Sequence, residues 1–201
     1  MKNAALLSAV LLVACAGPSP RPTQYLLRAQ PAESAGRVET PVRVGLGRIG
    51  VAPYLDQSGI VVQTQAGQVR AARQHQWAEP LDAGLRSYLR AEMSRALGYD
   101  VSANPADRVR WDYAVDVYVD QLHGNMAGTA VLDASYRITP RPAAGEVTEY
   151  RFSQSAPLPR EGYPGLVDAE AELARQLARA IAASLREIGE EQPPTAGGDG
   201  R

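Results

Sequence analysis

The second half of the chain alternates between apolar and polar positions, which predicts three consecutive strands. From Trp111 to Asp120 the odd positions are apolar, and three of the even positions are aspartates. This period of two indicates a strand with one buried face. A second such strand covers 130–138 and a third covers 147–153. A turn over 123–126 is expected to join the first two strands, so that the three form an antiparallel meander. The residues expected on the inner face of the first two strands are Trp111, Tyr113, Val115, Val117, Val119, Ala130, Leu132, Ala134, Tyr136 and Ile138.

Two other segments have apolar residues at helical spacing. The first follows Pro80, which suits the start of a helix, and ends at Gly98. The second covers 165–188, where leucines and isoleucines recur every three, four or seven positions, and Gly189 is its expected stop. The acidic residues in its first turns match the positive end of the helix dipole. They are Asp168, Glu170 and Glu172.

Shorter strands are expected before the first helix, over 24–28 and 42–49. The segments 60–65 and 68–73 flank Ala66-Gly67 and predict a hairpin with a tight turn. This order of elements predicts a mixed α/β fold, in which a mostly antiparallel sheet is covered by two main helices. About 165 residues take part, the usual size of a single domain, and we assign this domain to 24–189.

The segment 45–50 (GLGRIG) has the formal pattern of a dinucleotide-binding loop. In such a loop the third glycine lies in a helix, and an acidic residue about 20 positions later holds the ribose. Here Pro53 follows at once, 59–65 (GIVVQTQ) has strand character, and no acidic residue occurs between Asp56 and Glu79. The pattern therefore indicates a strand whose glycines are closely approached by another element.

The N-terminus has the layout of a secretory signal. Lys2 is followed by an apolar run over 4–12, interrupted only by Ser8. This run is about half of the 20 or so residues that span a bilayer, so it does not predict a membrane helix. The following residues, 12–15 (LVAC), resemble the lipobox of bacterial lipoproteins. In that class the signal is cut before the cysteine, whose sulfur carries a diacylglycerol and whose amine is acylated.

The lipobox resemblance implies that residues 1–14 are a removed signal peptide and that Cys15 carries fatty acyl chains such as palmitate. Cys15 is the only cysteine in the chain, so it has no disulfide partner. Ala16 follows it, where aspartate often directs retention at the inner membrane, and this favours the outer membrane. The alternative is an ordinary signal peptide cleaved nearby, which would leave Cys15 as a free or discarded thiol.

Composition argues against a nucleic-acid partner. Lysine and arginine total 21 against 22 for aspartate and glutamate, a formal net charge of −1. Binding to phosphate backbones requires a strongly basic face, and the arginines here are scattered. The proline-rich segment 15–23 is expected to form an extended linker after the lipidated cysteine, and 190–201 (EEQPPTAGGDGR) a disordered tail.

The chemically versatile side chains form no recognisable catalytic or metal-binding motif. Asp112, Asp116 and Asp120 would be spaced about 13 Å apart along a strand, whereas calcium ligands lie within about 2.6 Å of the ion, so a solvated face is expected. His75 and His123 lack metal-ligand spacing, and His123 is expected in an exposed turn. We therefore predict no metal, no cofactor and no catalytic residue, with a hydrolase of dispersed site as an alternative.

Two short stretches carry a family resemblance. They are 51–56 (VAPYLD), with 59–62 (GIVV) after it, and 76–81 (QWAEPL), which opens the first helix. Together with the lipobox-like sequence and 25–27 (YLL), they are similar to the ABC-type transport auxiliary lipoproteins, the family of the paraquat-inducible intermembrane transport lipoprotein. The likeness runs from the lipobox to about the end of the last helix.

The resemblance implies a non-enzymatic accessory component of an intermembrane lipid transport system. Such a chain would be lipid-anchored at the periplasmic face of the outer membrane. It would dock a mammalian-cell-entry (MCE) domain protein that spans the periplasm and, through it, an ABC permease and ATPase. A lipid- or small-ligand-binding lipoprotein that works alone is the alternative. The long last helix is also a candidate for part of a homo-oligomer interface.

Three residues are candidates for partner contact. Tyr54 and Leu55 follow Pro53 in a loop, where an exposed apolar pair would mark an interaction site. Trp77 comes just before the first helix, where it can instead serve as a core anchor that packs against the first turn of that helix.

Overall fold

The computed structural model describes residues 21–29, 42–141 and 146–191. The predictions for the signal peptide at 1–14, for Cys15, for most of the linker and for nearly all of the tail lie outside the described residues. Within the described ranges, no helix is both long enough and apolar enough to cross a membrane.

Strand β5 (Tyr113–Asn125) is the centre of the sheet. One edge of β5 pairs antiparallel with β6 (Thr129–Pro140), and β6 pairs antiparallel with β7 (Thr148–Pro157). This confirms the meander that the alternating pattern predicts. The predicted inner face is confirmed for the three valines of β5 and the five inward residues of β6, which are all at most 5% exposed. The prediction is wrong for Trp111, which precedes β5 and lines the groove on the opposite face together with Asp116 and Tyr118.

The turn between β5 and β6 begins later than the sequence indicates. β5 continues through His123 and Gly124 to Asn125, so the turn predicted over 123–126 is placed too early. Asn125 closes the observed turn, because its Oδ1 accepts the backbone N–H of Ala127 at 2.9 Å and that of Thr129 at 3.1 Å. Asparagine commonly stabilises turns through such bonds to backbone that follows it.

Two strands share the other edge of β5. β2 (Val44–Val51) pairs parallel with its first half, and β3 (Gly59–Gln65) pairs parallel with its last residues. β3 forms the expected hairpin with β4 (Gln68–Trp77), and β1 (Thr23–Tyr25) pairs parallel with the end of β4. The described strands make one mixed seven-stranded sheet in the order β1-β4-β3-β5-β6-β7, with β2 beside β5.

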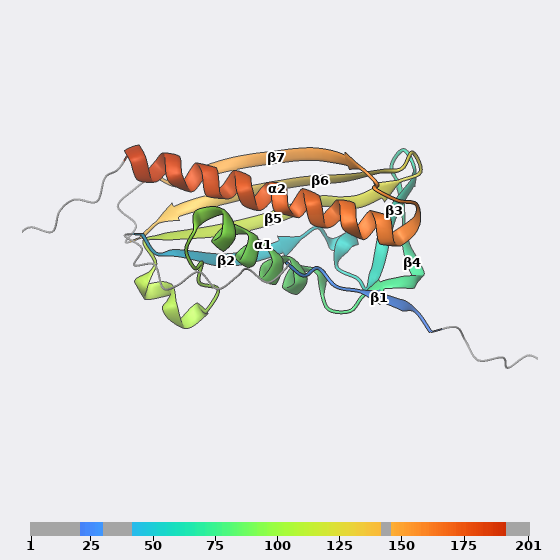
Figure 1. Ribbon diagram of the computed structural model, residues 1–201, viewed down its shortest axis with the longest axis horizontal. Coiled ribbons are helices and arrows are strands. Elements are labelled where there is room, and N and C mark those ends of the chain that lie inside the picture. Colours follow the sequence, from blue (N-terminus) through green and yellow to red (C-terminus); the bar gives the residue numbers. More distant parts are fainter. Residues whose placement is uncertain (1–20, 30–41, 142–145, 192–201) are drawn as a thin grey trace, which may run out of the picture.

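Two helices cover one face of this sheet, as the sequence predicts (Figure 1). α1 (Leu81–Leu97) packs on β2, α2 (Gly162–Glu191) packs across β5, β6 and β7, and the two helices contact each other. α1 ends at Gly98, whose φ of +83° is the left-handed conformation that favours glycine. α2 continues past Gly189, so the stop predicted there is wrong; a glycine costs a helix only about 1 kcal/mol, which packing can offset.

Other side chains approach the glycines of β2 closely, as the sequence of residues 45–50 predicts. Cβ atoms added at Gly45, Gly47 and Gly50 would lie within 2.9 Å of side chains that reach over from β5 and the segment before it. At Gly45 the neighbour is the indole of Trp111, which is only 4% exposed. The short 3-10 helices η2 (Pro53–Leu55) and η3 (Pro105–Arg110) follow β2 and precede β5.

Candidate functional site

Tyr54 and Leu55 lie in η2, directly after β2. Leu55 is 2% exposed and belongs to the core, so the expectation of an exposed apolar pair is wrong for Leu55. The reason is the tight turn, in which the backbone N–H of Leu55 donates to Ala52 and η2 folds back on the sheet. Tyr54 is half-buried, and its hydroxyl has no hydrogen-bond partner among the described residues. Burial raises the pKa of its phenol.

His123 is buried in β5 at 4% exposure, where the sequence indicated an exposed turn residue. Its ring centroid lies 6.3 Å from that of Tyr54. Nδ1 lies 3.2 Å from the backbone oxygen of Gly124, and Nε2 lies 3.3 Å from Oε1 of Gln121. The expectation is wrong because β5 extends past this residue, so that the imidazole is held within the sheet and packed against η2.

Glu170 of α2 is a buried carboxylic acid. It is 1% exposed, and its Oε2 has no hydrogen-bond partner among the described residues. Burial raises its pKa to about 8, so the carboxyl is mainly protonated at neutral pH. Glu170 therefore does not provide the negative charge that the sequence predicts near the positive end of the helix dipole. Glu92 of α1 is also buried, but it is paired with Arg95 at 2.5 Å and with Arg175 at 3.7 Å.

The apolar spacing of α2 contained a signal for Glu170. The buried positions recur at short helical intervals, except for the interval of seven between Leu166 and Leu173. A helix that buries both of these residues also buries the position one turn after the first, and Glu170 occupies it. An acidic residue at a position where the helical period of apolar residues expects another apolar residue is thus a candidate buried acid.

Tyr54, His123 and Glu170 are polar groups that are buried or partly buried, and the rings of Tyr54 and His123 are neighbours. Burial raises the pKa of Tyr54 most, and the carboxylates of Asp133, Asp120 and, when it is ionised, Glu170 add to that rise. A tyrosine, a histidine and a protonated acid are types of group that general acid–base catalysis uses, but catalysis also needs access for a substrate. The grooves described below are lined by other residues. In the described part of the chain, no group of three or more metal-ligating side chains is placed to hold an ion.

Trp77, at the end of β4, is 7% exposed and lies in the core, which confirms its expected place as a core anchor. Two positions earlier, His75 stacks on Tyr163 at the start of α2, with ring centroids 4.1 Å apart and planes inclined by 16°. The hydroxyl of Tyr25 lies 3.0 Å from Nδ1 of His75. One histidine thus joins β1, β4 and α2, a role that no local pattern in the sequence indicates.

A groove of about 590 Å³ lies where the β3–β4 and β5–β6 hairpins meet the start of α2. Its floor includes Gly124, where an added Cβ would lie 2.8 Å from the side chain of Leu166. Met126, in the β5–β6 turn, lines the groove and is 75% exposed. Other side chains that line it are Val62, Ala127, Leu158, Tyr163, Leu166, Arg70, Arg160 and the acidic Glu161.

The face of the sheet away from the helices is polar, as the aspartates of β5 predict. A groove of about 440 Å³ on this face is lined by arginines together with Asp116. Two of the aspartates also hold β2 in place. Oδ1 of Asp116 accepts the backbone N–H of Arg48 at 2.5 Å, and Asp112 accepts the backbone N–H of Arg43 at 2.7 Å. The hydrogen bond from the Arg43 side chain also lowers the pKa of Asp112.

Residues 25–182 match the sequence profile of a family described as the ABC-type transport auxiliary lipoprotein component. The intermembrane transport lipoprotein PqiC of Escherichia coli (strain K12) is 25% identical over 142 residues, which is 70% of this chain and 73% of that protein.

Two solved structures resemble this chain in fold. An uncharacterized protein that is 25% identical aligns with a TM-score of 0.69, over 83% of this chain and 99% of its own. A protein from Xanthomonas campestris that is 16% identical aligns with a TM-score of 0.67, over 84% of this chain and 98% of its own. At that identity the second similarity shows the fold alone.

Proposed function

Because the chain belongs to the family of ABC-type transport auxiliary lipoprotein components, we propose that it is a non-enzymatic accessory protein of an intermembrane lipid transport system. It is anchored to the periplasmic face of the outer membrane by acyl chains on Cys15. Its docking partner is an MCE-domain protein that spans the periplasm and connects it to an ABC permease and ATPase. The family match carries this proposal, because it extends from the end of β1 into α2 and so covers the sheet and both helices.

A lipid tether suits a docking protein for a physical reason. It confines the domain to a thin layer beside the bilayer, which raises the effective concentration of the domain for any partner that reaches this layer. Weak contacts then suffice for a stable assembly. Of the three residues predicted as partner contacts, Leu55 and Trp77 are buried, and we retain Tyr54 as a proposed contact because its side chain is only partly buried.

The docking function predicts that the partner is co-isolated with this chain. Full-length protein with a C-terminal affinity tag, extracted from membranes in mild detergent, should retain the MCE-domain protein through washing, since the tether brings the two surfaces together. Mass spectrometry of the eluate measures this. If both proteins are folded and abundant in the extract and the partner is still lost, the docking proposal fails.

Replacing Cys15 with serine should move the protein from the outer-membrane fraction to the soluble periplasmic fraction. Each buried methylene of an acyl chain contributes about 0.8 kcal/mol to membrane binding, so removing every chain abolishes anchoring. Density-gradient fractionation and intact-mass analysis of both proteins are the measurements. An unmodified wild-type mass, or a C15S protein that still carries acyl chains, would contradict acylation at this residue.

The groove between the hairpins and α2 favours a second candidate, a lipid- or ligand-binding protein that works alone. A carrier of that kind retains one apolar ligand per chain through purification. Native mass spectrometry of protein extracted from membranes distinguishes the two functions, because a docking protein releases bound lipid to detergent while a carrier keeps it.

A further inference from the structure

Three segments far apart in the sequence meet at one end of the molecule. The register of β3 against β5 places the β3–β4 turn at 65–68 beside the β5–β6 turn at 125–129. The backbone N–H of Leu158 donates to the carbonyl oxygen of Gly128 at 2.9 Å, which brings the third segment, 158–163, against the second turn. We name these three segments the turn end.

Large apolar side chains are exposed at the turn end. Met126 is 75% exposed, and Val69, just after the first turn, is 46% exposed. Met126 also lines the groove of about 590 Å³ between the hairpins and α2. Exposed apolar side chains gathered around a groove indicate a surface that contacts something other than water.

The charges at the turn end are mostly positive. Segment 57–78, which contains the β3–β4 hairpin, has no acidic residue, and segment 121–132, which contains the β5–β6 turn, has no aspartate, glutamate, lysine or arginine at all. Arg160 pairs with Asp168 of α2 at 2.7 Å. The charged residues of the turn end and of strands β3 and β4 are Arg70, Arg73, Arg160 and Glu161.

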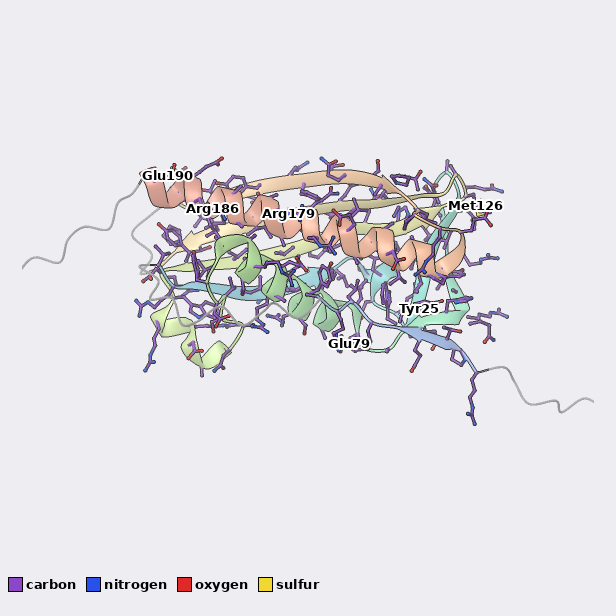
Figure 2. All side chains as sticks on the ribbon, in the orientation of Figure 1. Tyr25, Glu79, Met126, Arg179, Arg186 and Glu190 are labelled. Carbon is purple, nitrogen blue, oxygen red and sulfur yellow. The ribbon has the colours of Figure 1, made fainter. Side chains whose placement is uncertain are left out.

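The N-terminal tether enters the domain from the same end. β1 runs parallel to the last residues of β4, so the chain reaches β1 from the side on which β4 begins. Figure 2 shows Tyr25 and Met126 toward one end of the long axis and Glu190 at the other. Cys15 precedes Arg21 by six positions, a path of at most about 21 Å when fully extended, whereas α2 runs about 45 Å toward the far end.

We infer that the turn end rests on the surface of the bilayer in which Cys15 is anchored, an inference that depends on the proposed acylation. Arg70 and Arg73 face the lipid phosphates, and Met126 enters the headgroup layer. Basic side chains are attracted to an anionic bilayer surface, and the scarcity of acidic residues here removes the opposing repulsion. A bilayer fits better than a protein partner, because the short tether keeps this end beside the headgroups whether or not a partner is bound.

Site-specific labelling tests the contact in the full-length acylated protein. Because Cys15 is acylated, a cysteine introduced by Met126→Cys is the only free thiol and takes an environment-sensitive fluorophore. In vesicles of phosphatidylethanolamine and phosphatidylglycerol with headgroup-quencher lipids, the label at 126 should be strongly quenched. The matched control, Glu190→Cys at the far end, should be quenched little.

Equal quenching at the two positions, or none at 126, overturns the inference. Intact-mass analysis of the same sample confirms the acyl chains, so a failed contact is distinguished from a failed anchor, and co-isolation of the MCE-domain protein is measured separately. If the fluorophore at 126 becomes shielded from water only when the MCE-domain protein is added, the turn end docks a protein instead. That result would also overturn the membrane contact.

A second pair of variants tests the assigned arginines with the same label at 126. Each basic residue near an anionic surface strengthens association about fivefold, so Arg70→Gln combined with Arg73→Gln should weaken the contact of the turn end about 25-fold at low salt. The control is Arg179→Gln, an exposed arginine on α2 away from this end (Figure 2). The readout is quenching of the label at 126, and an unchanged value in the double variant contradicts the assigned arginines.

Discussion

Replacing Glu170 with glutamine is expected to raise the free energy of unfolding at pH 7 by up to about 3 kcal/mol. Burial holds the pKa of this carboxyl at about 8 in the folded protein, against an ordinary value of 4.5. Glutamine has nearly the same shape and has no proton to lose on unfolding. The variant therefore avoids the energetic cost that the wild-type protein incurs at neutral pH for keeping an acid protonated in the core.

The sign of the pH dependence follows from the two pKa values. The unfolded chain releases the Glu170 proton near pH 4.5, whereas the folded protein retains it until about pH 8. Stability is therefore highest below pH 4.5 as far as this residue is concerned, and it falls as the pH rises through this window. Each pH unit between the two values lowers the free energy of unfolding by about 1.4 kcal/mol, and above pH 8 the loss is complete.

Urea unfolding followed by circular dichroism from pH 4.5 to pH 8 measures this effect. The control variant is Asp168→Asn, because Asp168 lies on the same helix but is exposed and paired with Arg160 at 2.7 Å. Its stability should change with pH as that of the wild-type protein does. The lowered pKa of Asp112 has the opposite effect on stability, but that effect falls below its ordinary value of 3.8, outside this range, and is common to all three proteins. Parallel curves for E170Q and wild type would show that Glu170 is not a buried acid.

Replacing Gly45 with alanine is expected to lower the free energy of unfolding by about 3 kcal/mol or more. The added Cβ would lie 1.8 Å from Cδ2 of Trp111, so the buried indole must leave its site. Displacing a buried tryptophan forfeits contacts comparable to those lost on truncation to alanine, about 3–5 kcal/mol. Because Gly45 pairs with Ala114, the substitution is expected to weaken the contact between β2 and β5.

Urea unfolding and tryptophan emission together test the G45A prediction. The emission maximum should shift to longer wavelength as Trp111 becomes exposed, while Trp77 stays in the core. Gly189→Ala is the control, since nothing lies within 4 Å of a Cβ added there and a helical glycine replaced by alanine gains up to about 1 kcal/mol. A G45A protein as stable as wild type would show that the indole does not cover Gly45.

The helices and the meander were predictable because each depends on a local period. The apolar face of β5 and the glycine that ends α1 can be read from a window of a dozen residues, since side-chain direction repeats every two residues in a strand and every 3.6 in a helix. The glycines of 45–50 were likewise interpreted correctly, because Pro53 and the strand after it exclude a nucleotide-binding helix.

The candidate site was harder to predict, since its members act through contacts between distant segments. Leu55 was expected to be exposed and is buried, because η2 folds back onto the sheet. His123 was expected in a turn and lies inside β5, packed near Tyr54 from a segment about 70 positions earlier. Glu170 had the polarity of a surface residue, and only the packing of α2 on the sheet removes it from water.

The sequence by itself determined the order of the strands and helices, the faces of β5, β6 and α2 that turn inward, and the prediction of an acylated Cys15. Only the tertiary structure decided that β2 and β3 run parallel on one edge of β5, that Trp111 covers Gly45, and that Glu170 stays protonated in the core. The physical reason is that periodicity specifies which side of an element avoids water, whereas register, close approach and desolvation depend on which distant element covers that side.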